Sequence, residues 1–488
     1  MTGRHIHRPR GPWRELRFQL SWLIWPFLVV VACRSTPALE HGSGSVGASR
    51  GACSQGLDPA EGCALEMALT EHVGDRPIDA RIRALQARAR GSMVLAADLE
   101  RLGWAHIARA RELGDAGSYN MAGLCARAIE EHAPGNHGGM LLAGHVLHSL
   151  HRFSEAETMA QRLVSERGLS FDYGLLGDVL IDRGQVDAGI EAYQRMVEMR
   201  PDAHAYARAA HARYLRGDPS GAAEAMGMAA RAVSARNRET FAWTWAHLAR
   251  YQLQLGEVDA AFSAAQRALE VSPGSRYALL EKARALVAQG SLAAALAPLR
   301  KASADAPHPN VLWLFADVLE ATGLVVEAAA VRQRIEARGE AEDPRSLVLY
   351  LASRGRSLER ARRLIEHEFQ QRQDIYTHEA RAWLQSALGQ HRAALESARL
   401  SLAEGTVDPR LWYHAGAVAA RADEPELALT WLRSAAPLAH TLLPSQQRRL
   451  HQLLMQLTQL KRRHRLHPKA QDVEQHASSF IAEKGDTQ

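Results

Sequence analysis

The chain has 488 residues, which is too long for one ordinary hydrophobic core and indicates several domains or one repetitive array. A hydrophobic content of 47% excludes wholesale disorder, and the low aromatic content of 6% with frequent alanine favours helices over β-sandwiches. Residues 1–32 carry most of the net charge of +5, so residues 33–488 are close to neutral. A near-neutral chain has no general attraction to nucleic acid, and we expect no such partner.

Residues 1–32 have the layout of a bacterial export signal. Several arginines come first, and a mostly apolar run of thirteen residues follows them. This run is shorter than the roughly 20 residues of a transmembrane helix and matches the core of a signal peptide. It ends in Val30-Val31-Ala32, directly before Cys33, and this order resembles the lipobox of bacterial lipoproteins. The resemblance implies cleavage before Cys33 and acylation of its thiol; an uncleaved signal anchor with an incidental cysteine is the alternative.

Residues 33–68 should form a flexible tether, because the first part of this segment is rich in glycine, serine and alanine. Two or more acyl chains on Cys33 would anchor the chain stably in a membrane. The residue after Cys33 is Arg34 and not an aspartate. By resemblance to enterobacterial sorting rules, this favours a periplasm-facing lipoprotein of the outer membrane. Cys53 and Cys63 could form a disulfide in that oxidising compartment, and two unpaired thiols are the alternative.

A repeat of about 34 residues fills most of the remaining chain. Three features recur in order: a small residue in a first helix, a glycine between two helices, and a small residue early in the second helix. In the two clearest copies, Ala242–Ser275 and Arg276–Pro309, the glycines Gly256 and Gly290 hold the same offset. The copies start near residues 103, 137, 170, 204, 242, 276, 310, 342, 375 and 409.

Each feature has a physical role in a helical hairpin. Small residues let two helices approach closely, and glycine adopts the left-handed conformation that ends a helix. This order of residues resembles the tetratricopeptide repeat (TPR) family. The resemblance implies an all-α fold, an α-solenoid of about ten TPR-like helical hairpins with capping helices at both ends. The array covers residues 103–341 and 375–442, while residues 342–374 match poorly and are either an irregular helical repeat or a linker.

Segments on both sides of the array should cap it. Residues 69–102 are expected to form an N-terminal helical cap. Residues 443–467 carry a leucine stripe with helical spacing, so we expect a C-terminal capping helix there. Residues 468–488 are polar and are expected to be a disordered tail. Cys125 lies on an apolar helical face and should be a small core residue.

The resemblance also implies a concave groove that the first helix of each hairpin lines. The candidate groove residues are Phe171, Arg208, Trp243, Arg250, Tyr277, Arg284 and Tyr376. Aromatic rings beside a row of guanidinium groups suit an extended peptide that carries carboxylates. The alternative is that the rings pack between neighbouring repeats and that the arginines are solvated.

The sequence contains no Walker loop, no GxGxxG after a strand, and no GxSxG or HExxH motif. We therefore predict no catalysis, no cofactor and no metal site, with a cryptic enzyme as a remote alternative. The favoured function is a membrane-anchored scaffold, an assembly or recruitment factor of the bacterial cell envelope that binds a protein or peptide. The second hypothesis is a helper that binds polysaccharide on the aromatic rows, which acids or amides beside the rings would favour.

Overall fold

The computed structural model describes residues 64–304 and 308–466. The chain divides into a unit that ends at Leu57 and a unit that begins at Asp58, and the description below concerns the second unit. The predicted signal peptide, most of the tether, the predicted tail and the residues Cys33, Cys53 and Cys63 lie outside the described residues. Within the described ranges, none of the helices combines the length and the apolar character that a membrane span requires.

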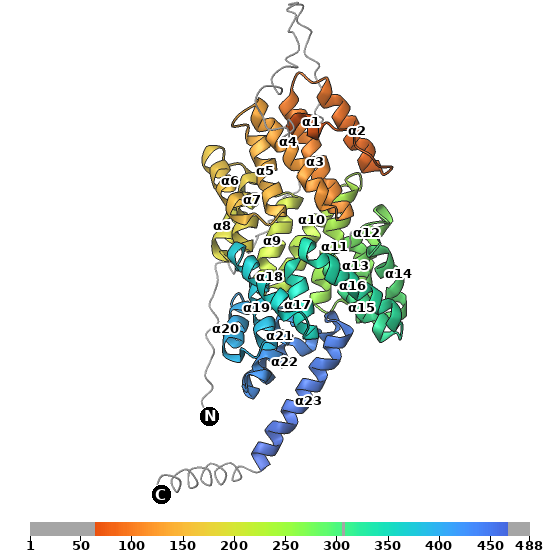
Figure 1. The fold of residues 1–488 in the computed structure, drawn as a ribbon, viewed down its shortest axis with the longest axis vertical. Helices are drawn as coiled ribbons and strands as arrows, with labels where there is room; N and C mark the ends of the chain where they lie inside the picture. Colours follow the sequence, from red (N-terminus) through yellow and green to blue (C-terminus); the bar gives the residue numbers. More distant parts are fainter. Residues whose placement is uncertain (1–63, 305–307, 467–488) are drawn as a thin grey trace, which may run out of the picture. The chain divides into compact units, whose positions relative to one another are not determined.

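The described residues form helices and no strand, which confirms the predicted all-α solenoid. From α3 to α22, consecutive helices pair as hairpins (Figure 1). The pairs are α3 (Leu95–Leu113) with α4 (Ala116–His132), α5 (His137–Ser149) with α6 (Phe153–Glu166), α7 (Ser170–Asp182) with α8 (Val186–Met199), α9 (Ala203–Leu215) with α10 (Pro219–Ala232), α11 (Arg238–Gln254) with α12 (Val258–Val271), α13 (Arg276–Ala288) with α14 (Leu292–Ala302), α15 (Pro309–Ala321) with α16 (Val325–Glu342), α17 (Pro344–Arg354) with α18 (Leu358–Gln371), α19 (Ile375–Ala387) with α20 (His391–Ser401), and α21 (Pro409–Arg421) with α22 (Pro425–Ala435).

Small residues hold the two helices of a hairpin close together, as the repeat pattern predicts. A Cβ built on Gly177 of α7 would lie 3.0 Å from the carbonyl oxygen of Gly189 in α8. Ala249 of α11 and Ala261 of α12 occupy the equivalent places in another hairpin, and both are fully buried. A larger side chain at these places would push the paired helices apart.

In two segments the helices are not where the pattern of small residues alone would place them. Helix α3 begins at Leu95, inside the range 69–102, because Leu99 and Leu102 are fully buried and extend the apolar face before the first small residue. Residues 342–374, for which the sequence left two interpretations open, include the hairpin of α17 and α18. Leu349 takes the place of the small residue in α17.

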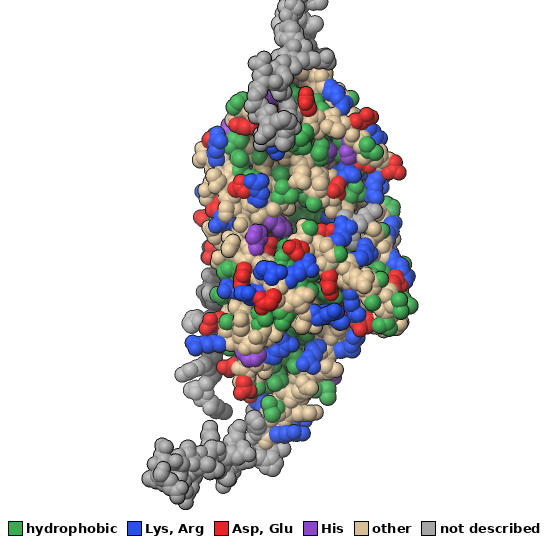
Figure 2. Space-filling view, viewed as in Figure 1, with side chains coloured by type: hydrophobic (Ala, Val, Ile, Leu, Met, Phe, Trp, Pro, Cys, Tyr) green, Lys and Arg blue, Asp and Glu red, His purple; other side chains and the backbone are tan. Residues whose placement is uncertain are grey.

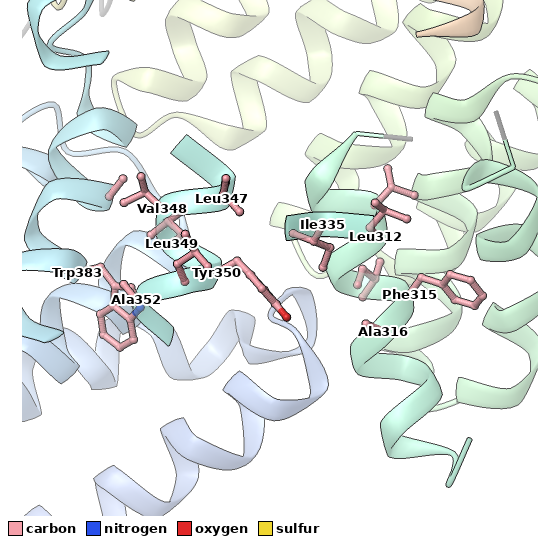
Figure 3. Close-up of a cluster of buried hydrophobic side chains, with 14 of the residues drawn as sticks. Leu312, Phe315, Ala316, Ile335, Leu347, Val348, Leu349, Tyr350, Ala352 and Trp383 are labelled. Carbon is pink, nitrogen blue, oxygen red and sulfur yellow. The ribbon is translucent and has the colours of Figure 1, made fainter. Parts of the chain in front are cut away.

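The largest buried apolar cluster surrounds α17. In Figure 3, Leu349 and Tyr350 of this helix lie between Trp383 of α19 and Phe315 of α15. Leu349 is 3% exposed, so its large side chain is buried at the place where other hairpins have a small residue. The segment is therefore part of the core, and its large apolar residues explain why the repeat pattern is weak there.

Short helices cover the N-terminal end of the array and a long helix covers the other end. Helix α1 (Ala64–Ala68) packs on α4, and α2 (Pro77–Arg90) packs on α3. At the C-terminal end, η2 (Ala436–Thr441) leads into α23 (Pro444–Leu466), which extends away from the other helices in Figure 1. A carboxylate oxygen of Asp317 accepts a hydrogen bond of 2.7 Å from the Ser445 backbone N–H, which satisfies one amide in the first turn of α23.

The array curls back on itself, so that helices far apart in the sequence touch. In Figure 1, α18 and α19 lie close to α8 and α9. The turn at Gly184 is packed against the Gln373 carbonyl, and the Tyr214 hydroxyl donates a hydrogen bond of 2.9 Å to Asp408. The Thr406 hydroxyl donates a bond of 2.7 Å to a backbone carbonyl of α9. We call these contacts, between residues 184–217 and residues 373–408, the coil junction.

Cys125 lies in α4 and is fully buried, as expected for a core residue. Burial raises the pKa of its thiol to about 12. The thiol therefore stays protonated and unreactive at neutral pH.

Candidate functional site

The first helices of successive hairpins enclose a cavity of about 740 Å³, which we call the inner cavity. Its wall comes from α3, α5, α7, α9, α11 and α13, with side chains of neighbouring helices between them. One further side chain, Tyr376, reaches the cavity from α19 across the coil junction. Aromatic rings dominate the lining: Trp104, Tyr119, Phe171, Tyr193, Tyr214, Trp243, Tyr251, Tyr277 and Tyr376.

Every candidate groove residue except Arg284 lines the inner cavity. Arg284 instead lines a neighbouring cavity of about 120 Å³, which Arg250 also reaches. The guanidinium of Arg284 donates a hydrogen bond of 2.7 Å to Glu281, one turn earlier in α13. The structure therefore brings the aromatic candidates together around one space and divides the arginine row.

Arg208 is occupied by a partner from the neighbouring hairpin. Its guanidinium donates two hydrogen bonds to Asp178, at 2.8 and 2.6 Å, and the Tyr193 hydroxyl donates a third to the same carboxylate at 2.8 Å. Burial alone would raise the pKa of Asp178, but the charge and hydrogen bonds of Arg208 hold it below its ordinary value. A bidentate pair of this kind fixes the cavity wall and leaves little of Arg208 for a ligand.

Arg250 is the candidate arginine that remains available. It forms no hydrogen bond or ion pair with any other residue in the described part of the chain, and it lies among Tyr214, Tyr251 and Tyr376 in the cavity wall. Over the whole lining, Arg111, Arg208 and Arg250 are matched by three carboxylates, so the inner cavity has no net charge. On the outer face shown in Figure 2, acidic and basic side chains are likewise interspersed.

Four histidines also line the inner cavity, and they are uncharged at neutral pH. Burial lowers the pKa of His145 to about 3 and the pKa of His247 to about 4. Burial likewise lowers the pKa of His204 and His211. A neutral imidazole offers one hydrogen-bond donor and one acceptor. The ring of His247 also packs on Trp243, with the two centroids 4.0 Å apart.

His148 shows a partner that the sequence analysis did not identify. Its Nε2 atom lies 2.8 Å from a carboxylate oxygen of Asp182, which belongs to the following hairpin. Burial would lower the pKa of His148, but the hydrogen bond and charge of Asp182 raise it above the ordinary value. Within the described ranges, no three His, Cys, Asp or Glu side chains are grouped so that they could hold a metal ion.

The sequence analysis also missed Tyr193, Tyr214 and Tyr251, which are nearly fully buried at the cavity wall. Tyr214 and Tyr251 lie in the last turns of the first helices α9 and α11, about one repeat apart. The repeat period could therefore have identified this second aromatic row. Asp178 and Arg208 are likewise separated by 30 positions, close to one repeat, so the same period could have indicated their pairing.

Comparisons with known proteins find similar solved structures but no matching family. No protein-family model and no curated protein matches the sequence. A chain in the crystal structure of the APC/C hetero-tetramer Cut9-Hcn1 is 14% identical with a TM-score of 0.41, over 81% of this chain and 62% of that chain. This protein thus spans less than two thirds of that neighbour's length.

Two further structures are similar over nearly their whole length. TTC0263, a thermophilic TPR protein of Thermus thermophilus, is 18% identical with a TM-score of 0.34, over 39% of this chain and 99% of its own. A human IFIT1 dimer with PPP-AAAA is 10% identical with a TM-score of 0.43, over 76% of this chain and 96% of its own. The described residues themselves form a helical-repeat solenoid, and the similar solved structures include a TPR protein.

Proposed function

We propose that the protein is a membrane-tethered helical-repeat scaffold that binds a segment of a protein or peptide partner in the inner cavity, without catalysis of its own. The observation that carries this proposal is the convergence of aromatic side chains from α7, α11, α13 and α19 on one cavity. Its volume of about 740 Å³ falls within the range of roughly 300–1,000 Å³ that ligand sites occupy.

The chemistry of the lining indicates what such a segment would carry. Broad apolar rings would contact aliphatic or aromatic side chains, because burial of these groups is the main source of binding energy. Arg250 has no hydrogen bond or ion pair among the described residues, so a carboxylate of the bound segment would form a charge-assisted hydrogen bond with it. The lining as a whole, Arg250 included, carries no net charge, so we propose one acidic group in the segment rather than a row of them.

Crosslinking from inside the cavity tests this proposal. A photoreactive phenylalanine derivative in place of Trp243 or Phe171 should capture the partner in the native host, and capture should fall when Arg250→Gln is added. Met199 is 50% exposed at the end of α8 and does not line the inner cavity, so the same derivative there is the control. Equal capture from Met199 and Trp243 would contradict binding in the cavity.

The proposed attachment to the outer membrane rests on the residues before Cys33, which resemble a lipobox. Labelling of cells with a palmitate analogue should mark the wild-type protein and leave Cys33→Ser unlabelled. The labelled protein should sediment with outer-membrane vesicles on a density gradient. A wild-type protein that carries no lipid, or an unprocessed N-terminus in its mass spectrum, would contradict this part of the proposal.

A glycan ligand is the second candidate, because carboxylates lie beside rings in the same cavity. Trp104 donates a hydrogen bond of 3.4 Å to Glu100, and Tyr193 donates to Asp178. The material captured from Trp243 distinguishes the two ligands. Protease treatment should shorten the adduct if the partner is a protein or peptide. An adduct that resists protease and is cut by a glycosidase would favour the polysaccharide alternative.

A further inference from the structure

A second cavity, separate from the inner cavity, lies at the C-terminal end of the array. We call this space of about 500 Å³ the C-terminal cavity. It is lined by the hairpins from α15 to α21, and α23 forms one side of it through Gln446, Arg449 and Leu453. No candidate residue of the sequence analysis lines it, although Arg354 and Arg421 hold the same place in their respective repeats.

The charge of this cavity differs from that of the inner cavity. Four arginines line it with two carboxylates. Arg332 already pairs with Glu320, and Asp317 is engaged with the first turn of α23. The three remaining arginines, Arg354, Arg421 and Arg449, form no ion pair with any residue of the described ranges.

Several other arginines on the inner side of the array have a carboxylate partner. Arg208 pairs with Asp178, Arg345 pairs with Asp374, and Arg410 pairs with Glu379. The three arginines without an ion pair among the described residues, Arg354, Arg421 and Arg449, are exposed, so a ligand could reach them without rearrangement of the fold.

Helix ends and an aromatic ring stabilise the positive charges of Arg354 and Arg421. Arg354 and Arg421 stand in the last turns of α17 and α21, where the helix dipole stabilises positive charge. Arg421 is also fixed in place: its guanidinium lies 5.0 Å from the centre of the Trp383 ring and donates a bond of 3.3 Å to the Ser386 hydroxyl. Partial desolvation by surrounding side chains and the charge of Arg449 lower the pKa of Arg421, although Tyr413 raises it, so the two cations repel each other.

We propose that the C-terminal cavity binds the phosphoryl group of a small phosphomonoester. A phosphate dianion would balance the excess of two positive charges in the lining, and guanidinium groups match its oxygens in bidentate geometry. The half-buried ring of Trp313 supplies an apolar surface for the rest of the molecule. The volume suits a small molecule. This inference is independent of peptide binding in the inner cavity.

Calorimetric titration of the full chain with phenyl phosphate at mildly alkaline pH tests the proposal. Loss of one charge-assisted hydrogen bond weakens binding by about tenfold to a hundredfold, so Arg421→Gln and Arg449→Gln should each raise the Kd by at least this lower factor. Two controls should leave the Kd unchanged. Arg462→Gln removes an exposed arginine of the same helix α23, and Arg250→Gln removes the available cation of the inner cavity.

Four results would overturn the proposal. The first is no heat of binding with the wild-type chain, and the second is loss of binding in Arg250→Gln instead of Arg421→Gln. The third is equally tight binding of benzoate, because the cavity would then not select a phosphate dianion over a carboxylate monoanion. A phosphoserine peptide that binds more tightly than phenyl phosphate would also contradict a small-molecule site. Far-ultraviolet circular dichroism of each variant separates lost binding from lost folding, and Arg449→Gln on the exposed side of α23 is the variant least coupled to the core.

Discussion

Gly184→Ala should destabilise the protein more than Gly323→Ala, although both glycines stand in turns between paired helices and have the same φ of +83°. Both substitutions place an L side chain in left-handed backbone, which costs about 1–2 kcal/mol. At Gly323 the new Cβ would meet no atom within 4 Å. At Gly184 it would lie 2.6 Å from the carbonyl oxygen of Gln373, on the other side of the coil junction.

The difference between the two variants isolates the coil junction. A Cβ at 2.6 Å from a carbonyl oxygen cannot be accommodated without a shift of backbone, and overpacking of this kind costs about 1–3 kcal/mol. Gly184→Ala should therefore lower the free energy of unfolding by about 2–5 kcal/mol, against about 1–2 kcal/mol for Gly323→Ala. Opening of the coil junction would relieve part of the additional cost of Gly184→Ala. That opening can be measured as an increase in the size of the molecule.

Urea unfolding followed by circular dichroism gives the two midpoints, and small-angle X-ray scattering gives the radius of gyration of each full-length variant. We expect the lower midpoint, the larger radius or both for Gly184→Ala, and a wild-type radius for Gly323→Ala. Gly217→Ala and Gly290→Ala form a second matched pair, because their φ angles are +73° and +75° and a Cβ at Gly217 alone would clash with the Gly405 carbonyl. Equal midpoints and equal radii within both pairs would refute the junction.

Two further predictions concern the core and the N-terminal end. Leu349→Ala should destabilise the protein by about 2–5 kcal/mol, because the deleted side chain is 3% exposed, whereas Leu400→Ala at a 50% exposed site should cost far less. Similar melting temperatures for these two variants would mean that residues 344–371 are a linker outside the core. Burial would raise the pKa of Asp79, but hydrogen bonds to His72 and Arg109 hold it at about 2. Because the folded value is below the unfolded one, this carboxylate contributes about 2 kcal/mol above pH 4 that is lost as the pH falls to about 2. Unfolding of Asp79→Asn at neutral pH and at about pH 3 should show a smaller loss of stability on acidification than the wild type, and an unchanged loss would contradict this role.

The positions of most hairpins could be predicted from the sequence, because close packing of two helices requires small residues at fixed places. Helices α5, α7 and α13 begin at His137, Ser170 and Arg276, where the repeat register placed their starts. The repeat pattern is hard to recognise around Leu349, because this large residue stands where other copies have a small one. Burial at Leu349 had to be observed, because the sequence alone left an irregular helical repeat and a linker both open.

Polar partners one repeat apart form a second class that the sequence could have revealed. His148 and Asp182 are 34 positions apart, and Asp178 and Arg208 are 30 apart. In a stack of similar hairpins, such spacing places side chains on adjacent helices. The predicted arginine row suited a ligand only where its guanidinium groups had no other partner. Arg208 has one in Asp178, about one repeat earlier in the sequence.

Contacts across the coil junction belong to a third class, for which the sequence holds no local signal. Tyr214 and Asp408 are 194 positions apart, and their meeting depends on the accumulated rotation of all the hairpins between them. Tyr376 reaches the inner cavity only because this rotation returns α19 to the neighbourhood of α9. The cavity wall is therefore complete only while the junction is closed. It follows that Gly184→Ala and Gly217→Ala, which line no part of the inner cavity, should reduce crosslinking from Trp243 as well as stability, whereas Gly323→Ala should preserve it.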